Sequence, residues 1–415
     1  MLRLMPVGSA GTVAADVRFR TRRGLVAALA VTQTVGYGVL YYSFGVLLGP
    51  MSAELGIPTA TAAGALTVAV LVSGAMSVPV GRWLDARGGH SLMTAGSVLG
   101  TLAVLGWSEV GSTAQLYGVF VLLGLASSMV LYEPAFAVVV AVTDPGRRAN
   151  ALLTVTLVAG LASSIFIPLT GWLADAYGWR GALQVLAVVY AALAIPLHLV
   201  SLRRTAPAVA GPQHSDRGAV ARVLRDRGFW LLAAGFVLHS GALAVVAVHL
   251  VLYLTRAGHR PALAATLAGL LGLLSVTGRV LISVLRRWLP MASIAATIFT
   301  LQGVALAMLP LVGDTVAGAA ACIVMVGLGF GVAAIAIPAL LLERYGATRY
   351  GTVAGTLAAP VIVSRATAPA GAALLAGAAG YRPVLFTVAV MAVAAAGCLL
   401  LSGRPGRAAR RRSRP

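Results

Sequence analysis

The sequence contains no lysine, only 11 acidic residues and only two cysteines. Without lysine the chain has no Walker A loop, whose lysine binds nucleotide phosphates, and no residue that forms Schiff bases. Cys322 and Cys398 lie in separate apolar runs, so we expect neither a CxxC redox pair nor a disulfide. Metalloprotease and nucleophile-elbow motifs are also missing. We therefore expect no enzyme activity, no metal site and no cofactor.

Charged residues are also scarce, at 10% of the 415 residues, whereas hydrophobic residues make up 59% and the mean hydropathy is +0.93. A bilayer core about 30 Å thick requires about 20 apolar residues per helix. The sequence offers twelve such windows, which predict an all-α membrane protein with spans at 25–50, 61–80, 91–108, 115–141, 151–173, 181–202, 229–254, 262–285, 291–312, 315–342, 352–377 and 383–401.

The distribution of arginine predicts how these spans are oriented. All 31 basic residues are arginine, and with a cytoplasmic N-terminus 25 of them fall on the inner side. Because positive residues collect on the cytoplasmic side of membrane proteins, both termini are expected inside. The net charge of +20 is then expected to meet a bilayer with an anionic inner leaflet, and not nucleic acid.

The longest polar stretch divides the chain into two sets of six spans. We expect a cytoplasmic basic arm, an N-terminal six-helix bundle, a central cytoplasmic loop, a C-terminal six-helix bundle and a basic cytoplasmic tail, at 1–24, 25–202, 203–228, 229–401 and 402–415. The halves are weakly similar, because Arg180 aligns with Arg382 at an offset of 202 and Pro134 with Pro338 at 204. This similarity predicts two pseudo-symmetric halves of the parallel-repeat kind found in secondary transporters.

The loop after the second window, VGRWLDARGGHSLM, resembles the GxxxDRxG signature of the major facilitator superfamily. Gly81 and Asp85 hold the expected places, Ala86 replaces the expected arginine, and Arg87 follows one residue later. The resemblance implies the major facilitator fold and alternating access. We expect Gly81, Arg82, Asp85 and Arg87 to form a conformational gate. In it, the Asp85 carboxylate would pair with arginines when the cytoplasmic side closes.

Two further stretches, GYGVLYYSFGVLLGPMSAELG and PLTGWLADAYGWRGAL, are similar to monocarboxylate porters and oxalate–formate antiporters. The antiporters carry a positive residue in each of helices 8 and 11, which grip the substrate carboxylates. Arg279 and Arg365 fall in the corresponding windows, so the resemblance implies an anion site between them. The alternatives are a structural ion pair for Arg365 and an inner-gate or lipid-facing role for Arg279.

The position of Arg365 itself also favours a functional role. It lies thirteen residues after Thr352 and twelve before Gly377, nearly 20 Å from either end of its helix at about 1.5 Å per residue. A charge at that depth costs at least ~2.5–3.5 kcal/mol, so it should face a cavity and a partner. A guanidinium binds carboxylates bidentately and keeps its charge at all relevant pH values, which suits anion binding.

Other polar residues inside the spans are also candidates. Glu133 is the one carboxylate predicted inside a span, and we expect it to carry a proton, to pair with an arginine or to steady a helix kink. Gln33, Tyr37 and Tyr41 recur every four residues and share a helix face that binds either a small substrate or a neighbouring helix. His239 lies mid-span and is expected to carry a proton or to bond a neighbouring helix.

From the sequence we therefore expect secondary active transport of a small organic anion, a mono- or dicarboxylate, with protons as the candidate coupling ion. The alternative is proton-coupled efflux of a hydrophobic drug or secondary metabolite. A third hypothesis is a sensor that binds its ligand without transporting it. The alanine- and arginine-rich, lysine-free composition suggests a bacterium of high GC content. We thus expect a monomer in the bacterial inner membrane.

Overall fold

The computed structural model describes residues 24–203 and 217–402. The predicted basic arm and tail, and half of the predicted central loop, lie outside these residues. In the described part of the chain, 11 helical segments are long and apolar enough to cross a bilayer. One of them, Pro145–Ser201, has 57 residues and turns at Gly178, where φ is 70°. At about 1.5 Å per residue it is far longer than a bilayer is thick, so it crosses twice. The predicted twelve crossings are confirmed.

The crossings coincide with the predicted windows, and several consist of two helices. In the N-terminal half the first crossing is Gly24–Glu54, which includes η1 (Gly38–Tyr42) and α2 (Ser43–Glu54). The second to fourth are α3 (Thr59–Arg87), α4 (His90–Ser108) and α5 with α6 (Thr113–Val130, Tyr132–Val142). The fifth consists of α7 (Pro145–Ala159) and the part of α8 (Ala162–Ser201) before Gly178, and the sixth is the rest of α8. A short helix, α9 (Arg217–Arg225), precedes the C-terminal half. That half comprises α10 (Arg227–Arg256), α11 (Pro261–Leu285), α12 (Met291–Val312), α13 with α14 (Val316–Leu328, Val332–Tyr345), α15 (Tyr350–Ala379) and α16 (Tyr381–Ser402).

Turns at matching places support the duplication of a six-helix unit. Gly56 and Gly258 have φ values of 64° and 100°, and Gly178 and Gly380 have φ values of 70° and 81°; both pairs are 202 residues apart. Glycine is favoured at such turns because a Cβ atom disfavours positive φ. The fourth crossing is interrupted between α5 and α6, and the tenth is interrupted between α13 and α14. The two halves therefore share two turns and the place of one interruption.

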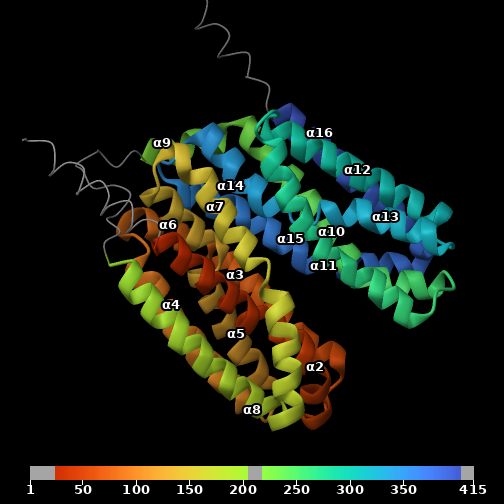
Figure 1. Ribbon diagram of the computed structural model, residues 1–415, viewed down its shortest axis with the longest axis horizontal. Helices are drawn as coiled ribbons and strands as arrows, with labels where there is room; N and C mark the ends of the chain where they lie inside the picture. The colour runs from red at the N-terminus through yellow and green to blue at the C-terminus, as the bar shows by residue number, and fades with distance from the viewer. Residues whose placement is uncertain (1–23, 204–216, 403–415) are drawn as a thin grey trace, which may run out of the picture.

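Figure 1 shows the two bundles joined at one end and diverging toward the other. Helices α3 and α15, one from each half, lie side by side at the junction. The end of α3 and the start of α15 meet there, and both belong to predicted inner loops. The halves are therefore in contact at the end that the sequence predicts to be cytoplasmic, called the cytoplasmic side below, and they diverge toward the predicted outer side.

Small residues allow this close approach. A Cβ atom on Gly81 of α3 would collide with the carbonyl oxygen of Gly351 of α15, and one on Gly355 would collide with the carbonyl oxygen of Ser77. The two backbones touch at these positions, as small residues permit in membrane helix pairs. Gly81 thus lies in the contact that closes the cytoplasmic end.

Candidate functional site

Arg365 lies in the middle of α15, and its side chain is exposed. The groups that act on it electrostatically are Tyr37, Tyr41, Tyr42 and Glu133, all in the opposite half. The side chain therefore faces the other bundle, where the two halves separate, and not the lipid. Among the residues the structure describes, none holds the guanidinium in an ion pair.

Aromatic side chains from the first and fourth crossings gather opposite Arg365. We call Tyr37, Tyr41, Tyr42, Tyr132 and Phe136 the aromatic cluster. The Tyr37 ring centroid lies 6.5 Å from that of Tyr41, 6.4 Å from that of Tyr42 and 4.6 Å from that of Tyr132. The π-helical turn η1 produces this arrangement, because a spacing of five residues brings positions 37 and 42 to one face. Tyr132 in turn stacks on Phe136 at 4.9 Å.

Glu133 is placed by the interruption of the fourth crossing. Leu131, with ψ of −156°, ends α5 and precedes α6, so Glu133 lies in the first turn of α6. A carboxylate is favoured there by the dipole of the short helix. Arg365 is the cation that acts on Glu133, but the two are too far apart for a direct ion pair. The two charges thus face each other across the halves without touching.

Gln33 is buried, whereas Tyr37 and Tyr41, with which it was predicted to share a helix face, are partly exposed. Its side chain is fully buried, and Nε2 donates to the carbonyl oxygen of Val130 at 2.7 Å. That carbonyl lacks its usual helical donor because Pro134, four residues later, has no N–H. Gln33 therefore satisfies the interrupted helix, and its predicted part in substrate binding stays a prediction that this geometry does not support.

Arg279 of α11 contacts the N-terminal half on the cytoplasmic side of the aromatic cluster. Its Nη1 donates to the carbonyl oxygen of Thr156 at 2.7 Å. The guanidinium occupies space left by glycines of both halves, since a Cβ atom would lie 2.7 Å from Nη1 at Gly160 and 2.5 Å from Nε at Gly331. Arg279 and Arg365 both act electrostatically on Tyr42. Arg279 therefore forms an inner-gate contact in this conformation and flanks the site from the cytoplasmic side.

His239 is not brought to this site. Its side chain is fully buried, and the ring stacks on Phe299 with centroids 3.6 Å apart. Neither ring nitrogen has a hydrogen-bond partner in the described part of the chain. The ring lies between α10 and α12 inside the C-terminal half, so a role in proton transfer stays a prediction.

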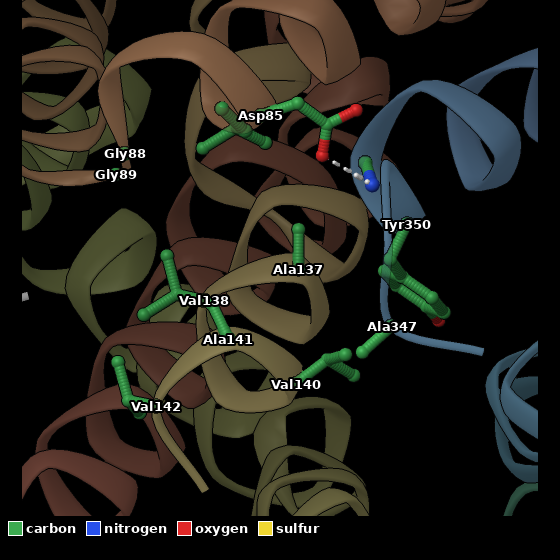
Figure 2. Close-up of a pocket in the computed structure, with 12 residues that line it drawn as sticks. Asp85, Gly88, Gly89, Ala137, Val138, Val140, Ala141, Val142, Ala347 and Tyr350 are labelled. Atoms are coloured by element: carbon green, nitrogen blue, oxygen red, sulfur yellow. Dashed lines mark hydrogen bonds between the residues drawn. The ribbon is translucent and has the colours of Figure 1, made fainter. Parts of the chain in front are cut away.

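The Asp85 carboxylate closes the cytoplasmic side. It accepts hydrogen bonds from the N–H groups of Gly351 at 2.9 Å and Thr352 at 2.7 Å, and from the Thr352 hydroxyl at 2.5 Å. Figure 2 shows the side chain directed at the first turn of α15, beside Tyr350. A carboxylate at a helix N-terminus satisfies free N–H groups and complements the helix dipole. Asp85 therefore links the two halves, as a gate residue should.

The hydrogen bonds of Asp85 come from α15 and not from arginine side chains, which differs from the expected pairing. Arg82 and Arg87 are exposed, and the Arg87 guanidinium lies over the Trp83 ring, 4.3 Å from its centroid. Backbone donors such as the α15 amides are already fixed in place, whereas a long arginine side chain must be ordered before it can bond the carboxylate. Arg82 and Arg87 thus lie next to the gate without taking part in its hydrogen bonds in this conformation.

Comparison with known proteins identifies the family. The family model of the Major Facilitator Superfamily matches residues 30–359. Monocarboxylate transporter 13 of Bos taurus is 30% identical over 285 residues, which cover 66% of this chain and 64% of that protein. An MFS-type efflux pump of Mycolicibacterium smegmatis is 30% identical over 177 residues, or 42% of this chain and 40% of the pump. The chain therefore matches less than two thirds of the length of these two relatives.

Solved structures share the fold. The fucose:proton symporter of E. coli superposes with a TM-score of 0.73 at 12% identity, covering 92% of this chain and 98% of the symporter. The human organic anion transporter MFSD10 gives a TM-score of 0.71 at 16% identity and covers 91% and 99%. The chain belongs to the Major Facilitator Superfamily and is a multi-pass membrane protein.

Proposed function

We propose that this transporter carries a small organic anion, a mono- or dicarboxylate, by alternating access. The observation that carries the proposal is Arg365, an exposed guanidinium in mid-span that faces the other half without a direct counter-ion. A charge at that depth requires a partner, and a carboxylate forms the strongest hydrogen-bonded pair with a guanidinium. The similarity to monocarboxylate transporter 13 supports the same substrate class.

The geometry supports a sequence of events. An anion enters from the open outer side and binds Arg365, with hydroxyl groups of the aromatic cluster as further donors. Tyr42, on which both arginines act, links the bound anion to Arg279. A substrate carboxylate competes with the Thr156 carbonyl for Arg279, and loss of that contact weakens the closed cytoplasmic side. Closure of the outer side and separation of Asp85 from α15 then release the anion inside.

Glu133 supports coupling to protons. Its carboxylate is the negative group of the protein that acts on Arg365 together with the tyrosines. An ionised Glu133 competes electrostatically with an incoming anion, and a protonated Glu133 does not. In this scheme proton and anion bind together, which makes the transporter a symporter.

The test is uptake of radiolabelled mono- and dicarboxylates into proteoliposomes. We expect saturable uptake by the wild type, its loss in Arg365→Gln, and its retention in Arg260→Gln, which removes an exposed arginine at the outer end of the fold. Wild-type kinetics in Arg365→Gln would contradict the proposal. Absence of flux for any solute by a folded wild type would favour a sensor.

Efflux of a hydrophobic, aromatic drug or secondary metabolite is a second candidate. The aromatic cluster favours it, because aromatic rings next to a cation bind planar apolar molecules as well as anions. The similarity to the MFS-type efflux pump points the same way. The discriminating experiment is growth of a drug-sensitive host on a panel of toxic compounds. Protection that survives Arg365→Gln would favour efflux over anion transport.

We also propose the bacterial cytoplasmic membrane as the location and a monomer as the working unit. Arginines in the predicted inner loops, among them Arg82, Arg87, Arg286 and Arg344, support this orientation by the positive-inside rule. Fractionation of a bacterial host and light scattering of the purified protein would test both statements.

A further inference from the structure

A cavity lies at the cytoplasmic end, away from Arg365. Its volume is about 450 Å³, which is within the range of about 300–1,000 Å³ that holds small ligands. The N-terminal half contributes the start of α7, and the C-terminal half contributes the α11–α12 connection and the end of α14. The cavity therefore exists only while the two halves are together on this side.

Each half supplies one arginine to the cavity wall. Arg148 comes from α7 and Arg286 from the end of α11. The Nε of Arg148 donates to the Thr143 carbonyl at 3.0 Å, which fixes the side chain and leaves its terminal nitrogens for a ligand. Glu343 is the one acidic residue of the wall, and in the described part of the chain no ion pair joins it to either arginine. The charged side chains of the wall therefore carry a net positive charge.

The other side chains that line the cavity are apolar, and exposed apolar side chains lie beside it on the surface expected to face the membrane. Leu152, Leu289, Met291 and Leu342 line the cavity. Leu289 is 49% exposed and the adjacent Trp288 is 71% exposed. An exposed tryptophan beside arginines is typical of the level of the lipid headgroups. A ligand that fits has an anionic phosphate group for the arginines and an apolar chain for the leucines.

From this combination we infer that the cavity binds the headgroup of an anionic phospholipid of the inner leaflet. The lipid phosphate bridges Arg148 of one half and Arg286 of the other, as arginines bind phosphates in general. A ligand that requires both halves binds the closed cytoplasmic side and loses its site when that side opens. The lipid therefore stabilises the outward-open conformation, because a ligand shifts the equilibrium toward the state it binds.

The binding experiment is native mass spectrometry of the full chain after exchange with phosphatidylglycerol or phosphatidylcholine. Arg148→Gln/Arg286→Gln removes both cavity arginines. Arg147→Gln/Arg287→Gln is the matched control, since it removes the same charge from neighbouring positions outside the cavity wall. We expect the cavity variant to lose a bound phosphatidylglycerol that the wild type and the control retain. Equal retention by both variants would overturn the site.

The conformational effect is measured as the distance between spin labels at Ala60→Cys and Ala317→Cys, in a Cys322→Ser/Cys398→Ser background. Both label positions are exposed and lie at the outer ends of α3 and α13. In phosphatidylcholine nanodiscs, added phosphatidylglycerol should lengthen the distance between the labels in the wild type and not in the cavity variant. Lipid binding without this change would overturn the conformational effect. The same change on addition of inorganic phosphate would assign the site to a soluble phosphate and not to lipid. Neither readout uses a transport substrate, so both are independent of the proposed function.

Discussion

The two arginines inside the spans have different environments, although both lie within apolar helices. Arg365 is exposed and has no direct counter-ion among the described residues, whereas Arg279 is half-buried and bonded to the Thr156 carbonyl across the halves. A group without a partner is available to a ligand, and a group already bonded stabilises the conformation that contains the bond. Arg365 is therefore the better candidate for anion binding, and Arg279 for linking binding to the gate.

Arg279→Gln should shift the protein toward the inward-open conformation. A hydrogen bond from a charged group contributes about 1.5–3 kcal/mol, so its loss changes the conformational equilibrium by roughly 10- to 100-fold. Spin-label distances across the outer ends report this shift, with Arg260→Gln as the control. If Arg279→Gln left the distances unchanged and instead abolished substrate binding, Arg279 would be a direct substrate ligand.

Glu133→Gln should separate anion exchange from proton coupling. The amide keeps the size of the carboxyl group but cannot ionise, so it mimics the protonated state in which Arg365 is free for the anion. We expect exchange of internal for external substrate to persist, while the response of net uptake to a pH gradient is lost. A variant that still responded to the gradient would exclude Glu133 as the proton carrier.

At the scale of the element, each half contains an interrupted helix with a carbonyl that accepts a hydrogen bond from a buried glutamine. Gln33 donates to Val130 at 2.7 Å in the N-terminal half, and Gln302 donates to Val326 at 2.8 Å in the C-terminal half. The donors come from the first and the ninth crossings, so the halves reach the same result from different helices. The Val130 carbonyl has lost its helical donor, and a buried carbonyl left unpaired is costly in a membrane, whereas the Val326 carbonyl also accepts from the Gly329 N–H at 3.2 Å.

Gln33→Leu should lower the stability of the N-terminal half without changing substrate affinity. The substitution leaves the Val130 carbonyl unpaired, at a cost of about 1–3 kcal/mol. Thermal melting of the purified protein and the KM of uptake are the two measurements. Gln184→Leu, at an exposed position, is the control and should melt as the wild type does. A raised KM with unchanged melting would restore Gln33 as a substrate ligand.

For the whole molecule, apolar run length predicted the twelve crossings, because it reflects the thickness of the bilayer. The orientation expected from the distribution of arginine stays a prediction. The site depended on irregular backbone, which a regular helical spacing cannot predict. Tyr42 was missed because the π-helical turn places it beside Tyr37. Tyr132 was missed although its neighbour Glu133 was identified as a candidate. The sequence YEP offered a signal, because two polar residues precede a proline inside an apolar span. The sequence left Gln33 open between a substrate and a neighbouring helix, because the free carbonyl at Val130 follows from Pro134 and not from the helix that carries Gln33.

The closed cytoplasmic side of the whole molecule depends on backbone contact between α3 and α15. A single added side chain at this contact should separate the two helices. A Cβ atom at Gly355 would collide with the Ser77 carbonyl oxygen, whereas one at Gly371 on the same helix would meet nothing within 4 Å. Gly355→Val should therefore hold the cytoplasmic ends apart and trap the transporter inward-open, while Gly371→Val should behave as the wild type. The spin-label distance between the outer ends should shorten in Gly355→Val, and uptake driven from outside should be lost. An unchanged distance with normal uptake would mean that the halves close through other contacts, and that the α3–α15 interface follows the transport cycle without controlling it.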